Sequence, residues 1–270
     1  MRREDFIEEI KNGVADMGEI ITQEVNRANT QYTGLTVRKV GVPVPVVNLD
    51  ELYIRYEDTD ATMEDCIERA REVLDMAPPS SVSIEKVTDW EIAKTKLYFR
   101  PMKHVDNGLF KKMEDIFLVP YIQLADDCSM ATRVTPQLCE HWGVTEEEVF
   151  EATRTNQEEL LPATITDMCE ILGMPAAPFP ILVISNNIKA FGASAIFYDG
   201  VADTVRERIG GDFYILPSSV HEMIAVPKID NDVEALRSMV TTINGDVVDA
   251  WDRLSNSVYT YDNGEFRRVV

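Results

Sequence analysis

The clearest pattern of apolar and polar positions along the chain lies between residues 180 and 270. Short apolar runs alternate there with amphipathic stretches. This pattern predicts a strand-strand-helix unit that occurs twice in succession, followed by a closing strand pair. Residues 213–216 are apolar on both faces, so we expect them to form a central strand. The predicted strands are 181–186, 193–198, 212–216 and 222–226, the helices are 200–209 and 230–244, and the hairpin joins 257–261 to 266–270.

A long helix is predicted near the N-terminus. Apolar residues recur at three- and four-residue steps across residues 4–28, from Ile10 to Val25, with charged side chains on the opposite face. Two apolar runs follow, 35–40 and 42–49. The second run contains two prolines, which cannot donate to a sheet, so we expect it to be an edge strand at best.

A second amphipathic helix is predicted over residues 61–77. Asp60 is placed to cap its first turn, and Pro78-Pro79 is placed to stop it. Residues 78–84 then have the composition of a connection and form the best candidate for an internal boundary.

Strands dominate the middle of the chain. The apolar runs 96–102 and 116–125 predict two strands, with a short helix over 107–113 between them and a further strand over 129–134.

A helix start follows, where Thr145-Glu-Glu-Glu148 has the sequence of a capping box and predicts a helix to about residue 159. Another helix is expected around 165–172, closed by Gly173, and residues 174–180, with three prolines, are expected to form a loop.

These elements together predict an α+β protein with mixed, mainly antiparallel sheets and helices packed against them. Its last part is expected to be a β-β-α repeat followed by a hairpin. The expected regions are an N-terminal helical and strand region (1–84), a middle α/β region (85–178) and a C-terminal region (179–270). We expect them to form one compact unit of two lobes, split near residue 84 or 178.

Charge narrows the range of partners. The chain of 270 residues carries 26 basic and 47 acidic side chains, a net charge of −21, spread along its whole length. Binding to nucleic acid or to an anionic membrane needs clustered Lys and Arg, which this sequence lacks. We therefore expect the protein to bind neither nucleic acid nor a membrane. The N-terminus lacks the apolar core of a signal peptide, no membrane span is evident and the four cysteines are widely spaced, so we expect a cytoplasmic protein with reduced thiols.

The segment 217–222 contains the most suggestive group of reactive side chains, Ser218, Ser219, His221 and Glu222. A serine, a histidine and a carboxylate can suggest a hydrolase. A catalytic triad, however, usually draws its members from separate elements, and neighbouring side chains on an extended backbone point apart. We therefore expect a hairpin turn that can serve as a binding surface, and we assign no catalytic residue.

Metal and cofactor motifs are also incomplete. Cys139 and His141 are two residues apart, which does not match the usual spacing of zinc ligands. The sequence contains no phosphate-binding loop and no G-x-G-x-x-G motif. We expect neither a metal nor a cofactor.

Several segments resemble those of one family found in gut Clostridia and other Firmicutes, often on integrated mobile elements and prophages. The segments are 192–198, 211–222 and 254–262, together with 142–148 and 53–56. The family is classified as a domain of unknown function, and the resemblance covers most of the chain. It implies a family identity but no activity and no site residues.

Three functions are consistent with this sequence. The first is a non-enzymatic, cytoplasmic accessory protein that acts through protein–protein contact, because no catalytic or cofactor motif is complete. The second is an acidic anti-defence or regulatory protein of a mobile element that mimics DNA. The third is a hydrolase whose active-site residues are scattered along the sequence.

Overall fold

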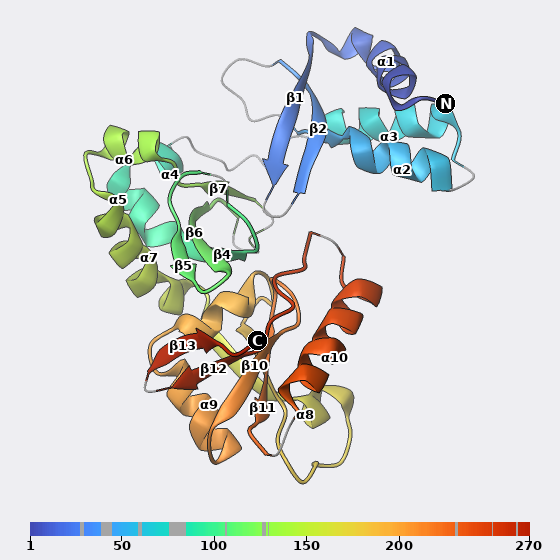
Figure 1. Ribbon diagram of the computed structural model, residues 1–270. Helices are drawn as coiled ribbons and strands as arrows, with labels where there is room; N and C mark the ends of the chain where they lie inside the picture. The colour runs from blue at the N-terminus through green and yellow to red at the C-terminus, as the bar shows by residue number, and fades with distance from the viewer. Residues whose placement is uncertain are drawn as a thin grey trace. The chain divides into compact units, whose positions relative to one another are not determined.

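Figure 1 shows the computed structural model of the protein, in which helices accompany three mainly antiparallel sheets. The predicted α+β fold class is confirmed. The chain folds into two compact units, an N-terminal unit (Met1–Val82) and a C-terminal unit (Ser83–Val270). The structure describes residues 1–27, 30–38, 45–58, 61–75, 85–105, 107–125, 128, 130–229, 232–249, 251–262 and 264–270.

The N-terminal unit packs three α-helices against a small antiparallel sheet, in which β2 lies between β1 and β3. Its core is apolar and is centred on Phe6, Ile10 and Leu35, none of which is exposed to solvent. The elements are α1 (Arg3–Gly13), η1 (Ala15–Met17), β1 (Ile20–Arg27), β2 (Thr30–Val37), β3 (Val47–Asn48), α2 (Leu49–Asp58) and α3 (Met63–Asp75).

The helix predicted over residues 4–28 is wrong in its second half. Helix α1 ends at Gly13, and the chain forms strand β1 from Ile20. Gly18 lies between them with a φ of 138°, a conformation that ends a helix and that favours glycine. Residues 20–25 are rich in β-branched side chains that favour a strand, and β1 pairs with β2 along its whole length.

The predicted second helix is confirmed as α3, and the edge strand is confirmed as the short β3. Asp60 and Pro78-Pro79 lie outside the described residues. The first turn of α3 is capped by Thr62, whose hydroxyl accepts a hydrogen bond from the Asp65 N–H at 3.2 Å. The Asp65 carboxylate in turn accepts the Thr62 N–H at 2.7 Å. Helix α2 was not predicted.

The first part of the C-terminal unit is a four-stranded antiparallel sheet in which β6 pairs with all three other strands. Helix α7 packs against β4. The elements are α4 (Glu85–Thr88), α5 (Trp90–Ala93), η2 (Lys94–Lys96), β4 (Leu97–Met102), β5 (Lys111–Met113), β6 (Ile116–Gln123), β7 (Ala131–Arg133), α6 (Pro136–Trp142) and α7 (Glu146–Leu160).

Three of the predicted elements in this part are confirmed as strands β4, β6 and β7. The helix predicted over 107–113 is wrong, because Lys111–Met113 forms strand β5, which pairs with the first residues of β6. Gly108, just before this strand, has a φ of 87°, a left-handed conformation that a helix would not contain.

The capping box of α7 is confirmed. The Thr145 hydroxyl accepts the Glu148 N–H at 3.2 Å, and the Glu148 carboxylate accepts the Thr145 N–H at 2.7 Å. These hydrogen bonds to Thr145 hold the pKa of Glu148 below its usual value. The contribution of this carboxylate to stability is therefore present at neutral pH and is lost as the pH falls through that lowered pKa.

We expect Thr145→Ala to lower the free energy of unfolding by about 1 kcal/mol, the usual cost of losing an N-cap. Thr155→Ala is a matched control, because Thr155 is exposed in the middle of the same helix and alanine favours helix formation. All three tryptophans (90, 142 and 251) lie in the C-terminal unit, so urea unfolding followed by tryptophan fluorescence reports on it. Equal stability of the two variants would contradict the role of the cap.

The second part of the C-terminal unit is a six-stranded antiparallel sheet in the order β13-β12-β10-β11-β9-β8. The expected central position of residues 213–216 is confirmed, because β10 lies inside the sheet. The elements are β8 (Ala163–Asp167), α8 (Met168–Leu172), β9 (Leu182–Asn186), η3 (Gly192–Phe197), α9 (Val201–Ile209), β10 (Phe213–Pro217), β11 (Met223–Pro227), α10 (Val233–Asp246), β12 (Tyr259–Asp262) and β13 (Glu265–Arg268).

Both faces of this sheet are covered (Figure 1). Alternate residues of β10 point to opposite sides, so Phe213 and Ile215 pack with η3 and α9, whereas Leu216 packs with α10 through Val240. This two-sided burial explains why residues 213–216 are apolar throughout.

Two predictions in this part are wrong. Residues 193–198 form the 3₁₀ helix η3 rather than a strand, so the first of the two predicted β-β-α units lacks its second strand. Phe191 enters this turn with a φ of 55°, and Gly192–Ile196 is buried. The helix expected around 165–172 is reduced to α8, because residues before it pair with β9 as strand β8.

Candidate functional site

The four side chains singled out by the sequence lie in the turn between β10 and β11, and all four are half-buried. The Ser218 hydroxyl lies 3.2 Å from the Glu222 carboxylate, to which it donates. The Ser219 hydroxyl accepts the His221 N–H at 3.0 Å, and the Ser219 N–H donates to the Glu222 carbonyl at 3.3 Å. The two serines and Glu222 therefore form hydrogen bonds within the turn itself.

His221 connects the turn to two distant segments. Its Nδ1 accepts the backbone N–H of Phe191 at 3.1 Å, and its Nε2 lies 3.3 Å from the Asp252 carboxylate. Because Nδ1 accepts this hydrogen bond, the N–H of the neutral ring is on Nε2 and faces Asp252. Neither ring nitrogen is left to activate a serine hydroxyl, so this geometry gives no support to a hydrolase at the turn.

A half-buried arginine, Arg100 on β4, stacks on the ring of Phe191. Its guanidinium carbon lies 3.8 Å from the centroid of the Phe191 ring and 4.6 Å from that of Tyr121. Its Nε donates to the Tyr98 hydroxyl at 2.6 Å, and a terminal nitrogen donates to the Cys128 carbonyl at 3.0 Å. Burial raises the pKa of Tyr98, which stays a neutral phenol. Arg100, Phe191 and His221 thus form a packed connection between the two sheets of the C-terminal unit.

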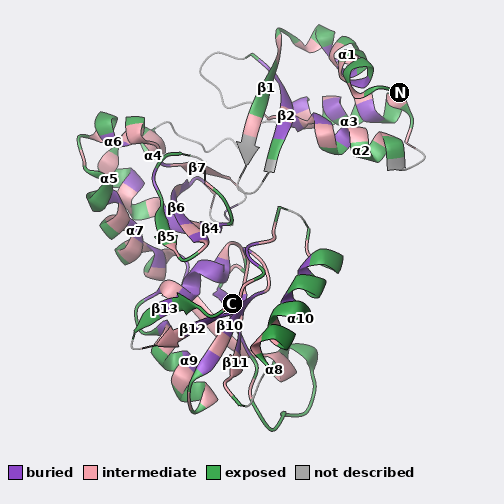
Figure 2. Cartoon of the chain, in the orientation of Figure 1, coloured by how far each residue is buried: buried purple, intermediate pink, exposed green. Residues whose placement is uncertain are grey.

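A second feature of the unit is an exposed apolar segment, residues 171–181, which we call the contact segment. It runs from the end of α8 to the start of β9, and it contains no charged side chain. In Figure 2 the loop after α8 is coloured as exposed. Its large apolar side chains are exposed to 52% (Ile171), 61% (Leu172), 58% (Met174), 54% (Phe179) and 38% (Ile181).

Both ends of the contact segment are anchored. The Asp167 carboxylate accepts the Cys169 N–H at 2.8 Å and caps α8, while Gly173 closes the helix in a left-handed conformation. Strands β8 and β9, which flank the segment, pair with each other at the edge of the sheet. The apolar side chains are therefore presented by the end of α8 and by a short loop with fixed ends.

The loop predicted over 174–180 is confirmed, but the exposure of its apolar side chains was not predicted. Apolar residues are buried when they share one face of a helix or strand. The three prolines of the loop 174–180 prevent both structures, so the apolar residues of this loop have no common face to bury. An uncharged run interrupted by prolines was the signal that could have identified this surface.

Helix α10 carries a second exposed apolar surface. Met239, Ile243 and Val247, the residue directly after the helix, follow one another at four-residue steps and are exposed to 45%, 44% and 78%. Leu236 and Val240, on the adjoining face of the helix, pack against the sheet. In Figure 2 the outer side of α10 is correspondingly marked as exposed.

The cysteine and histidine pair considered for a metal is split between two environments. Cys139 is buried in α6, where burial raises the pKa of its thiol, and His141 is exposed. In the described part of the chain, no three His, Cys, Asp or Glu side chains gather into a group that could hold a metal ion. All four thiols are free, three of them buried and Cys169 half-buried. None of the helices in the described ranges combines the length and apolar character needed to cross a membrane.

Comparison with known protein families gives a match to nearly the whole chain. The model of a family described as a family of unknown function, DUF5688, matches residues 3–263. A search of curated proteins found no match, and a search of solved structures found none either.

Proposed function

The chain belongs to the DUF5688 family of unknown function, and from the geometry of its C-terminal unit we propose that it is a cytoplasmic, non-enzymatic accessory protein that acts through protein–protein contact. The observation that carries the proposal is the contact segment. Five large apolar side chains are exposed there within a stretch that has no charge, in a protein whose net charge is −21. Exposed apolar patches of this kind mark interaction sites.

The structure of the contact segment suits binding. Burying apolar surface contributes about 25 cal/mol for each Å² removed from water. The prolines and the anchored ends restrict the loop before a partner arrives, so less conformational entropy is lost on binding than for a free chain. An apolar, pre-ordered loop can therefore contribute to affinity at a modest entropic cost.

We infer that the partner is a protein with an apolar groove bordered by basic residues. Glu170 is exposed directly before the contact segment, and the protein as a whole is strongly acidic. Opposite charges around an interface accelerate association and exclude like-charged competitors. The apolar groove would supply most of the affinity, and the basic border would supply orientation.

The test is capture of partners from a lysate of a bacterium that carries the gene, with wild-type protein and with the double variant Leu172→Ser/Phe179→Ser. We expect wild type to retain one stoichiometric partner at about 1 M salt, where exposed charges are screened, and the double variant to lose it. The free energy of unfolding of the double variant is expected to change by less than about 0.5 kcal/mol, because both side chains are exposed.

The matched control is Ile54→Ser/Ile92→Ser, which removes two other exposed apolar side chains (58% and 39%). This control is expected to bind as wild type does. Equal capture by both double variants, a partner that is released by salt, or no partner at all would contradict the proposal.

A further inference from the structure

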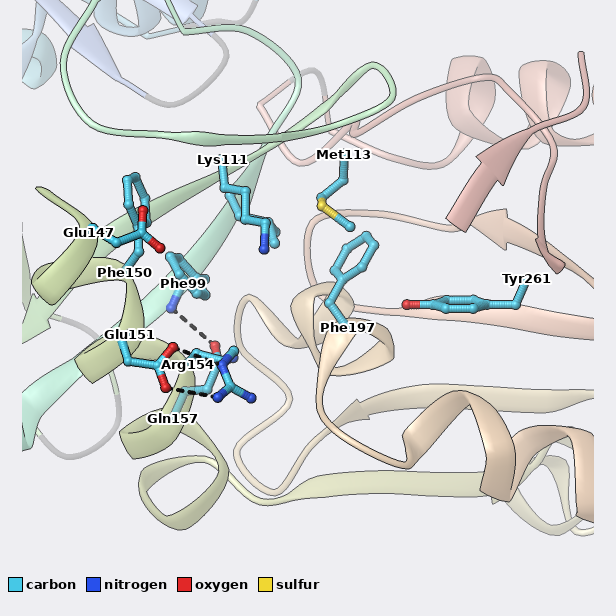
Figure 3. Close-up of a pocket in the computed structure, with 11 residues that line it drawn as sticks. Phe99, Lys111, Met113, Glu147, Phe150, Glu151, Arg154, Gln157, Phe197 and Tyr261 are labelled. Carbon is cyan, nitrogen blue, oxygen red and sulfur yellow. Dashed lines mark hydrogen bonds and ion pairs between the residues drawn. The ribbon is translucent and has the colours of Figure 1, made fainter. Parts of the chain in front are cut away.

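A cavity of about 160 Å³ lies in the C-terminal unit, away from the turn at His221 and from the contact segment. Figure 3 shows the side chains of α7 on one side of it and Phe197 and Tyr261 on the other, with Lys111 and Met113 of β5 at the top of the view. The α7 residues fall at three- and four-residue steps from Glu147 to Gln157, so they share one face of the helix. Lys111 and Met113 are two apart on β5 and so share one face of the sheet.

Aromatic rings form the walls of this cavity. Phe99 stacks on Phe150 with 6.2 Å between ring centroids. Phe197 makes an edge-on contact with Phe266, with 4.9 Å between the ring centroids, which restricts its position. Tyr261 also lines the cavity, and its pKa is raised chiefly by burial, so it remains neutral at physiological pH. The space between these walls is suited to one apolar ring.

One charged pair at the cavity is already satisfied. Arg154 binds both carboxylate oxygens of Glu151, at 2.8 and 3.2 Å, and the Asp199 carboxylate at 2.6 Å. The hydrogen bond from Arg154 is the main reason that the pKa of Glu151 is lowered. Arg154 is therefore a fixed part of the wall.

Three other polar groups remain available. Within the described residues, the Lys111 ammonium and the Glu147 carboxylate make no hydrogen bond or ion pair. Gln157 is only 2% exposed, and its carbonyl oxygen accepts the Phe99 N–H at 3.4 Å, while its amide nitrogen donates to no group that the structure describes. Gln157 lines the cavity, so its free amide nitrogen can donate a hydrogen bond to an oxygen atom of a ligand there.

From these groups we propose that the cavity binds a small zwitterion with one ring, of the chemistry of a free aromatic α-amino acid. The ammonium of the ligand pairs with Glu147, its carboxylate pairs with Lys111 and the Gln157 amide, and its ring lies between Phe99 and Phe197. Arg154 is paired with Glu151 and Asp199, so Lys111 and Glu147 are the lining charges that face a ligand, one of each sign, and they match a ligand that carries one charge of each sign. An apolar cavity of about 150 Å³ holds a benzene ring, which matches the space available.

The test is a ¹⁹F NMR titration of the full chain with 4-fluorophenylalanine. N-acetyl-4-fluorophenylalanine, which lacks the ammonium, and 4-fluorophenylalanine amide, which lacks the carboxylate, are titrated in parallel. We expect saturable binding of the free amino acid, and binding about tenfold or more weaker for each blocked form, because each loses a charge-assisted hydrogen bond.

Matched variants locate the site. Lys111→Met and Glu147→Gln are each expected to weaken binding by about tenfold. Lys112→Met and Glu146→Gln are the controls, because Lys112 points to the other face of β5, with its ammonium 5.8 Å from the Phe117 ring centroid, and Glu146 does not line the cavity. Both controls should bind as wild type does.

Three results would overturn the proposal. These are no saturable binding at about 10 mM ligand, blocked forms that bind as tightly as the free amino acid, or equal losses in the variants and their neighbouring controls.

Discussion

Replacing Gly192 with alanine is expected to destabilise the C-terminal unit by about 3 kcal/mol. A Cβ atom at this position would lie 2.6 Å from the Asn186 backbone nitrogen and 2.8 Å from the His221 carbonyl oxygen, and it would collide with the Ser185 hydroxyl. The first two atoms belong to the backbone, which cannot rotate away. Overpacking of a rigid site costs about 1–3 kcal/mol, and here three atoms are displaced together.

The same substitution would disturb the connection at His221. The Ser185 hydroxyl donates to the His221 carbonyl at 2.8 Å, and the added methyl group would lie against both. Gly211→Ala is the control, because a Cβ there meets nothing within 4 Å, and we expect its effect to stay within about 0.5 kcal/mol. Urea unfolding followed by tryptophan fluorescence measures both variants. A loss below about 1 kcal/mol for Gly192→Ala would show that the backbone here relaxes readily.

Phe213→Ala is expected to lower the free energy of unfolding of the C-terminal unit by about 3–5 kcal/mol. Phe213 lies on the central strand β10, is only 1% exposed and packs in the core between the sheet and α9. Its removal deletes a buried ring and leaves a cavity that strands on both sides of β10 hold open. The central position of the strand limits the collapse that could reduce this cost.

Phe179→Ala removes the same side chain from the contact segment, where it is 54% exposed. We expect this control to change stability by less than about 0.5 kcal/mol. The pair of variants therefore separates residues that hold the fold from those available to a partner. Similar losses in both would mean that the contact segment belongs to the core, contrary to the proposed function.

Local signals in the sequence were sufficient for several elements. The two-sided apolar run 213–216 predicts a central strand, and β10 is one. The capping box at Thr145 predicts the start of α7, and both of its hydrogen bonds are present. In each case neighbouring residues determine the structure, so no knowledge of distant contacts is needed.

Other elements depend on contacts that a local pattern does not contain. The spacing of Met17, Ile21 and Val25 fits a helix, but pairing with β2 makes this stretch a strand. Residues 193–198 have the composition of a strand, yet the tight packing of Gly192 against β9 turns them into η3. Here tertiary contacts override local propensity.

The candidate sites follow the same division. The sequence identified His221 but not its partner Asp252, which comes from a distant segment. It also gave no indication of the cavity, whose lining residues come from separate helices and strands. Such groups of side chains are assembled only by the fold, and single residues such as Lys111 and Glu147 have no distinctive local pattern.

The most direct test of the proposed function is photo-crosslinking from the contact segment in cells. Benzoylphenylalanine is placed at Phe179, and in a matched protein at Phe110, another exposed phenylalanine (37%) of the C-terminal unit. We predict a covalent adduct with one partner protein from position 179 and none from position 110. Equal adducts from both positions, adducts only with a second copy of the chain, or none from position 179 would contradict the proposed function.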